Sequence, residues 1–260
     1  MTGDPRYDEV SYPGLPFIQT HPDRLCTLAR LFGLAAPEPA TSRVLEIGCG
    51  DGGNLIPMAY GLPAATFTGI DTSAPAIAAA QARTEELGLA NVGFEQISLT
   101  DFEPPRGGVD YVLAHGVYSW VPEPVRAALL ALCARALSVD GVAYVSYNAL
   151  PGGRLRQALR EILAAELEGI EEPAAKLAAA RELLATLRSA WTYDDGLATL
   201  GGLASSMLEA GDALLYHDTL APQNTPLYFR DFASAARRAG LQFLAEANFW
   251  EMQEIGRAHV

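Results

Sequence analysis

"VLEIGCGDGGN", residues 44–54, decides the fold. A short apolar run ends here in glycines, with one carboxylate, Glu46, just ahead of them. A buried strand, a glycine turn and a helix open a doubly wound α/β sheet, in which ligands bind beyond the carboxyl ends of the strands. Gly48, Gly50 and Gly53 also match the spacing G-x-G-x-x-G of dinucleotide-binding loops. Because that spacing is a weak signal alone, the neighbouring residues must identify the ligand.

Strands and helices alternate around this loop. Short apolar runs predict strands, and helical periodicity between them predicts helices, of which the one that follows Ser73 ends near Gly88. The expected strands are 43–47, 65–70, 92–97, 109–114 and 141–147, and the expected helices are 21–33, 74–88 and 122–137. This pattern predicts a parallel sheet that helices cover on both faces.

The pattern changes after residue 150. Apolar residues at helical spacing predict amphipathic helices at 155–167 and 177–191 and a third within 197–210. We expect these helices to form an insertion over the ligand edge of the sheet. A helix at 225–240 with Thr225 as its cap and a sixth strand at 241–249 are expected to follow.

The composition excludes several classes of protein. The net charge of −13 repels phosphate backbones, so nucleic acid is not an expected partner. Three scattered cysteines suit a reducing compartment without disulfides. No apolar run resembles a signal peptide or a membrane span, which predicts a cytoplasmic protein. His21 and His217 are isolated from other ligand types, so no metal is expected.

Three carboxylates follow three successive predicted strands and favour one ligand. Glu46 suits a ligand with an ammonium and a sulfonium group, as in S-adenosylmethionine (SAM), better than it suits a pyrophosphate. Asp71 can accept both ribose hydroxyls, of SAM or of NAD. Asp101 can accept the adenine amine, with Phe102 or Leu99 beside the ring, although it can also be a simple loop residue. The trio together predicts SAM.

These stretches carry a family resemblance. "VLEIGCGDGGN", "TGIDTS" and "LTDF" resemble the class I SAM-dependent methyltransferases over residues 43–148. "YPGLPFIQTHPDRLCTLARLFGL", "AHGVYSWVP", "VAYVSYNALPGG" and "LAPQNTPLYFRDFASAARRAGLQFLAEANF" resemble a bacterial branch with an appended methyltransferase regulatory domain. The resemblance implies a Rossmann-like sheet, SAM as cofactor and a methyl acceptor, which in some relatives is a protein lysine. A small-molecule acceptor stays open.

The resemblance and the strand ends together name candidate site residues. The expected cofactor-binding residues are Glu46, Gly48, Cys49, Gly50, Asn54, Asp71, Thr72, Thr100, Asp101, Phe102 and His115. His115 can instead be a polar cap on the fourth strand. The expected acceptor-site residues are Tyr118, Tyr147 and Asn148, and Tyr7 and Tyr12 are candidates for a lid.

The expected domains and the tail complete the prediction. They are an N-terminal arm and helix (1–40), the SAM-binding domain (41–150), the helical insertion (151–220) and the start of the regulatory domain (221–253). One choice of codons for "EIGRAHV", residues 254–260, spells a common sequencing-adapter sequence, so we expect a truncated gene product. The family's seventh strand would then be missing, and the unpaired sheet edge could drive self-association.

Two further classes compete with a methyltransferase. An NAD-dependent oxidoreductase would share the glycine loop and Asp71, but Glu46, Asp101 and the lack of an acid–base pair near the fourth or fifth strand argue against it. A non-catalytic SAM-binding module would keep the same cofactor residues and differ only in activity. Transfer of a labelled methyl group separates these possibilities.

Overall fold

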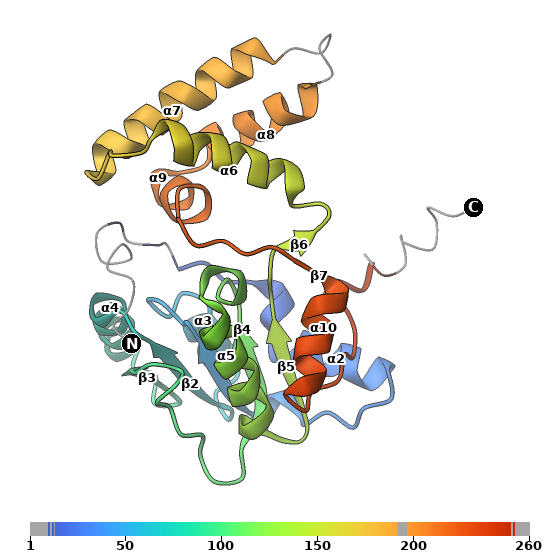
Figure 1. The fold of residues 1–260 in the computed structure, drawn as a ribbon. Coiled ribbons are helices and arrows are strands. Elements are labelled where there is room, and N and C mark those ends of the chain that lie inside the picture. Colours follow the sequence, from blue (N-terminus) through green and yellow to red (C-terminus); the bar gives the residue numbers. More distant parts are fainter. Residues whose placement is uncertain (1–9, 11, 13, 192–196, 251, 253–260) are drawn as a thin grey trace. The chain divides into compact units, whose positions relative to one another are not determined.

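The computed structural model describes residues 10, 12, 14–191, 197–250 and 252 of the chain. Tyr7 and the tail 254–260 lie outside these residues. The chain divides into two compact units (Figure 1). Of the described residues, the first unit holds 14–147 and 229–252, and the second holds 10, 12 and 148–228.

The first unit is built on a five-stranded sheet in which every pairing is parallel. The strands are β1 (Arg43–Ile47), β2 (Thr66–Asp71), β3 (Val92–Gln96), β4 (Val109–Ala114) and β5 (Leu137–Val145). Their order, β3-β2-β1-β4-β5, reverses direction between β1 and β4. The predicted Rossmann-like sheet is therefore confirmed, and its switch point lies at the carboxyl end of β1.

Helices cover both faces of this sheet. They are α2 (Pro22–Leu31), α3 (Leu55–Gly61), α4 (Ala74–Glu86), α5 (Glu123–Ala136) and α10 (Phe229–Arg238). The predicted cap of α4 is confirmed, because the amide of Ala76 donates to Ser73 Oγ at 3.4 Å. Figure 1 shows α10 beside α5, and α5 packs on β4 and β5. The 3₁₀ turns are η1 (Ile18–Thr20), η2 (Pro39–Thr41) and η3 (Tyr118–Trp120).

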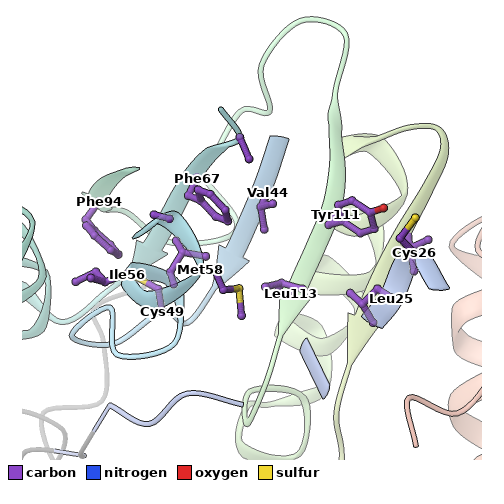
Figure 2. Packing of buried hydrophobic residues seen from close by; sticks show 14 of the residues in the cluster. Leu25, Cys26, Val44, Cys49, Ile56, Met58, Phe67, Phe94, Tyr111 and Leu113 are labelled. Carbon is purple, nitrogen blue, oxygen red and sulfur yellow. The ribbon is translucent and has the colours of Figure 1, made fainter. Parts of the chain in front are cut away.

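Alternate residues of the strands fill two hydrophobic layers. Val44, Phe67 and Tyr111 face a cluster with residues of α2, α3 and α4 (Figure 2). Their neighbours Leu45 and Val112 are also fully buried. Burial on both faces explains why these strands read as nearly continuous apolar runs in the sequence.

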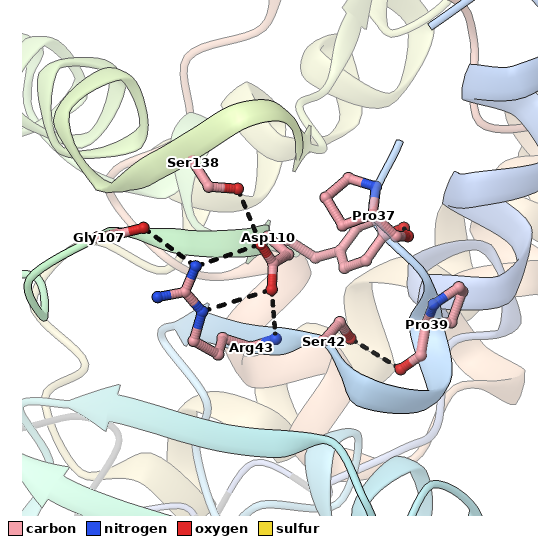
Figure 3. Close-up of polar contacts among 8 residues, drawn as sticks. Pro37, Pro39, Ser42, Arg43, Gly107, Asp110 and Ser138 are labelled. Carbon is pink, nitrogen blue, oxygen red and sulfur yellow. Dashed lines mark hydrogen bonds and ion pairs between the residues drawn. The ribbon is translucent and has the colours of Figure 1, made fainter. Parts of the chain in front are cut away.

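A polar cluster ties three strands together at their amino ends (Figure 3). Asp110 accepts hydrogen bonds from the backbone amide of Arg43 at 2.8 Å and from Ser138 Oγ at 2.8 Å. The Arg43 guanidinium approaches the same carboxylate at 3.4 Å. Burial alone would raise the pKa of Asp110, but these hydrogen bonds and the guanidinium outweigh it and lower that pKa. The cluster stabilises the sheet opposite its ligand edge.

The second unit is mainly helical. It contains β6 (Ala149–Leu150), α6 (Arg154–Glu166), α7 (Pro173–Ala190), α8 (Ala198–Glu209), α9 (Asp212–Leu214), the π-helix η4 (Leu215–Thr219) and β7 (Leu227–Tyr228). The predicted apolar positions Leu159, Leu163 and Leu184 are fully buried in its core, whereas Leu155 is exposed. β6 and β7 pair in parallel.

At the return to the first unit, the predicted helix is present but its predicted start is wrong, and the predicted sixth strand is wrong. The helix begins at Phe229 rather than near Thr225, because Leu227 and Tyr228 pair with β6. The sixth strand at 241–249 is absent from the described residues, because residues 241–248 are irregular and residue 249 is helical. Side-chain contacts hold this segment instead of a strand ladder: Leu244 packs on the core, and Arg24 Nε donates to the carbonyl of Ala247 at 3.2 Å.

No helix in the described part of the chain combines the length and the apolar character that a bilayer crossing requires.

Candidate functional site

The glycine loop joins β1 to α3 and holds its shape through backbone hydrogen bonds. Gly48 has a φ of +73° and donates to the carbonyl of Ile70 at 2.8 Å. Gly50 has a φ of +53°, and no atom lies within 4 Å of the position that a Cβ would take there. A ligand can therefore approach the backbone at Gly50. Cys49 between them is buried, and burial raises the pKa of its thiol.

Glu46 is a buried carboxylate with one oxygen unsatisfied. Its side chain is 3 % exposed, and Oε1 accepts from Asn54 Nδ2 at 2.7 Å. Oε2 has no hydrogen-bond partner among the described residues. Burial raises the pKa of Glu46 to about 8, the hydrogen bond from Asn54 lowers it, and the charge of Asp71 raises it. A cation or a strong donor at Oε2 would remove this penalty.

Asn54 connects Glu46 to the N-terminal arm. Its Oδ1 accepts from the backbone amide of Phe17 at 2.9 Å, and its Nδ2 donates to Thr20 Oγ1 at 3.1 Å. The arm also touches the glycine loop, where a Cβ on Gly53 would lie 2.4 Å from the carbonyl carbon of Gly14. Asn54 therefore positions the carboxylate and the arm, whereas a direct cofactor contact from Asn54 stays a prediction.

Asp71 ends β2 and braces the glycine loop. Its Oδ2 accepts from the amide of Gly50 at 2.9 Å, and its Oδ1 accepts from the amide of Ser73 at 2.9 Å. Each carboxylate oxygen keeps a second acceptor direction for a ribose hydroxyl. Thr72, next along the chain, is exposed.

Asp101 lies in a turn after β3, the strand that pairs with β2. Asp101 is exposed, and its Oδ1 accepts from Thr100 Oγ1 at 3.2 Å. The Phe102 side chain is buried, and its carbonyl accepts from Arg135 at 2.7 Å. Asp101 thus follows β3, next to the strand that Asp71 ends, so the three carboxylates of the predicted trio belong to the ends of the neighbouring strands β1, β2 and β3.

His115 follows β4 and is covered by the arm. The Phe17 ring packs on it with 3.8 Å between the ring centroids, and the Tyr144 hydroxyl lies 3.2 Å from His115 Nδ1. Burial lowers the pKa of His115, which favours the neutral imidazole. A neutral ring can donate or accept one hydrogen bond at this edge without adding charge.

Two of the expected acceptor-site residues form an aromatic trio with a residue that the sequence did not indicate. Phe232 of α10 stacks on Tyr147 at 4.3 Å and meets Tyr118 edge-on at 5.2 Å. Tyr118 is 3 % exposed, and burial raises the pKa of both tyrosines. The third expected residue, Asn148, lies in the second unit, where its Nδ2 donates to Asn224 Oδ1 at 3.2 Å.

The remaining predicted polar residues have local structural roles. His21 caps α2, with its Nδ1 accepting from the amide of Asp23 at 3.2 Å. His217 is buried in the second unit, and its ring contacts the carbonyl of Val10 and the Tyr12 ring. No group of three potential metal ligands occurs among the residues that the structure describes.

Comparison with known proteins agrees with this geometry. Residues 44–141 match the model of a methyltransferase domain, and residues 211–256 match that of a predicted methyltransferase regulatory domain. The chain belongs to the class I SAM-dependent methyltransferase family. Two Rickettsia prowazekii proteins are similar: RP789, 39% identical over 95% of this chain and 45% of its own length, and RP028, 32% identical over 92% and 96%.

A solved structure shares the fold over most of this chain. PKMT2 from Rickettsia typhi, in complex with AdoHcy, matches with a TM-score of 0.83 and 32% identity, over 91% of this chain and 46% of the PKMT2 chain. The chain therefore spans less than half the length of PKMT2 and of RP789.

The residues present fit SAM, the cofactor of the family. The unsatisfied Glu46 Oε2 suits the ammonium of its methionine part, the open space at Gly50 suits close approach of the ligand to the loop, and Asp71 retains acceptor directions for the ribose. A pyrophosphate would instead bring negative charge toward Glu46 and Asp71.

Proposed function

We propose that this chain transfers a methyl group from SAM to an amine nitrogen of a protein acceptor, with lysine as the amino acid. The observation that carries the proposal is Glu46 Oε2, a buried oxygen without a donor beside the glycine loop. The match to PKMT2 and the resemblance to a branch in which some relatives methylate a protein lysine support the acceptor class.

The chain's own residues would bind and orient the reactants. Glu46 would hold the ammonium, Asp71 the ribose hydroxyls and Asp101 the adenine amine. Bound SAM supplies a methyl group on a good leaving group, so the protein needs only to orient an uncharged amine toward it. The rings of Tyr118, Tyr147 and Phe232 offer a wall that attracts a lysine ammonium by cation–π interaction before it loses its proton.

The test is transfer of a radiolabelled methyl group from SAM to proteins of a bacterial lysate, followed by amino-acid analysis of the labelled product. We expect labelled methyl-lysine with the wild type and about tenfold less label with Asp71→Ala at limiting SAM, because a bidentate contact is lost. Label only in small molecules would contradict the protein acceptor. SAM binding without any transfer would make the chain a binding module.

A further inference from the structure

A cavity of about 450 Å³ lies within the second unit, among residues that the predicted SAM site does not include except for the acceptor candidate Asn148. Its polar lining residues are Asn148, Arg156, Gln157, Arg160, Thr199 and Asn224. No Asp or Glu occurs among the described residues that line it. The net charge of the chain is −13, so the described lining, with two arginines and no carboxylate, is positive in an otherwise acidic protein.

The two arginines bring positive charge to the cavity, Arg160 in a fixed position and Arg156 on an exposed side chain that can move. They lie one turn apart on α6, so their side chains share a face of the helix. Arg160 is 6 % exposed, and its guanidinium donates to the carbonyls of Asp218 at 2.5 Å and Thr219 at 2.7 Å and to that of Ala221. These three acceptors are backbone carbonyls, and together they fix the position of the guanidinium. Arg156 is exposed and can turn toward a ligand.

One carboxylate interacts with both arginines electrostatically. Burial raises the pKa of Asp218, while Arg156 and Arg160, followed by a hydrogen bond from Tyr12, lower it. Asp218 does not line the cavity. Asp218 thus carries one negative charge near two guanidinium groups.

Neutral donors add to this positive field. Asn148 donates to Asn224 Oδ1, which leaves the amino group of Asn224, with its two N–H donors, on the same lining. Gly153, the N-cap of the 13-residue helix α6, also lines the cavity, and its helix has no side-chain cap. The amide of Arg154 donates to the carbonyl of Pro151 at 3.0 Å, and the positive end of the helix at the next amides favours a negative group, in addition to the arginines.

We propose that this cavity binds a carboxylate or phosphate group, which Arg156 clamps against the amides of Asn148 and Asn224. The fork of an arginine side chain matches the two oxygens of either group. The group can belong to a free small acid or to an acidic side chain of a protein.

The test is calorimetric titration of the full chain, without SAM, with three probes: inorganic phosphate, citrate, and a lysine peptide that carries glutamate, compared with its glutamine analogue. We expect saturable binding of at least one probe and at least tenfold weaker binding by Arg156→Gln, since about one bidentate contact is lost. Arg154→Gln is the matched control, because Arg154 is exposed on the same turn but does not line the cavity. It should change the affinity less than about twofold.

Each outcome decides the proposal. Binding of phosphate or citrate supports a free acid as the ligand, and binding of the glutamate peptide alone supports a protein side chain. Absence of saturable binding with every probe overturns the proposal, as does equal weakening by the two arginine variants. If Arg156→Gln lowers the unfolding midpoint, Arg156→Lys is measured in its place. Unchanged affinity of a folded Arg156→Lys together with lost affinity of Arg154→Gln would also overturn the proposal. Because SAM is absent, the result is independent of methyl transfer.

Discussion

Asn54 donates to Glu46 Oε1 at 2.7 Å and, through its own Oδ1, accepts the backbone amide of Phe17 at 2.9 Å. One side chain thus orients the carboxylate at the end of β1 and fastens the N-terminal arm. The other carboxylate oxygen, Oε2, is left for a ligand. The proposed cofactor contact of Glu46 and the position of the arm therefore both depend on the Asn54 side-chain amide.

SAM binding should release a proton from Glu46. Burial raises the pKa of Glu46 to about 8, so near pH 7 the free protein holds this carboxyl largely protonated, and an ammonium at Oε2 would favour the ionised form. We expect the affinity for SAM to rise from pH 6 to pH 7.5. Calorimetry in two buffers of different ionisation enthalpy measures the released proton. In Glu46→Gln the proton release should vanish and binding should weaken at least about tenfold; an identical pH slope in the variant would contradict this account.

The same group should shape the stability of the ligand-free protein. Its folded pKa, about 8, lies above the ordinary value for Glu, so its favourable contribution is complete below pH 4 and is lost as the pH rises toward 8. Glu46→Gln removes the ionisation. We therefore expect the free energy of unfolding of the wild type to fall by about 3–4 kcal/mol relative to the variant between pH 5 and pH 8. Urea titrations at both pH values measure the difference, and parallel pH profiles would refute the burial of a titrating carboxyl.

Asn54→Ala should weaken SAM binding about tenfold, because Glu46 loses the donor that orients it. A purely structural loss would lower stability alone, so the decisive readout is the number of protons released on SAM binding. Asn91→Ala is the matched control: Asn91 Nδ2 donates to the carbonyls of Ala59, Leu62 and Ala65, away from the carboxylates. The control should lower the unfolding midpoint and leave affinity and proton release unchanged. Equal effects of the two variants on SAM binding would remove Asn54 from the positioning role.

Local patterns predicted the first unit well. The strand 43–47 matches β1 residue for residue, and the Ser73 cap and the Gly88 stop are both present. These features depend on neighbours in sequence: apolar alternation, caps and glycines with positive φ. The family motifs are of the same local kind, which is why the carboxylate trio could be named before the fold was known.

Contacts between distant segments were harder to predict. Phe232 joins Tyr118 and Tyr147 only because α10 returns to the sheet, and its apolar helical pattern is equally typical of a plain core residue. The segment 241–249 alternates like a strand, but a strand also needs a backbone partner, and side-chain contacts hold this segment instead. The cavity of the second unit combines α6, α8 and the segment before β7, which no single motif marks.

Phe232→Leu should separate acceptor binding from cofactor binding. Leucine keeps apolar volume but removes the ring face that an amine would meet beside Tyr118 and Tyr147. We expect kcat/KM for a lysine acceptor to fall about fivefold or more, since a cation–π contact contributes roughly 1 kcal/mol, while the Kd for SAM stays within about twofold. The control is Phe243→Leu, because Phe243 is half-exposed and its ring pairs with Phe229. This control should change neither kcat/KM for the acceptor nor the Kd for SAM. A weaker SAM affinity with unchanged acceptor kinetics would make the trio part of the cofactor site.

Asp110→Asn should destabilise the sheet without touching the ligand edge. Asp110 accepts from the Arg43 amide and from Ser138 Oγ and faces the Arg43 guanidinium, and loss of its charge should cost about 2 kcal/mol. Its folded pKa is depressed, so this stability is present above the ordinary pKa of Asp, about 4, and is lost as the pH falls through the folded value. The variant should lack that acid-induced loss. Asp231→Asn, which breaks an exposed ion pair with Arg230, should change stability by less than about 0.5 kcal/mol. Urea unfolding at pH 7 and at pH 3 measures the free energy of unfolding of both variants and of the wild type. The difference between the wild type and Asp110→Asn should be large at pH 7 and small at pH 3. A difference that is the same at both pH values would mean that the charge of Asp110 contributes nothing to stability.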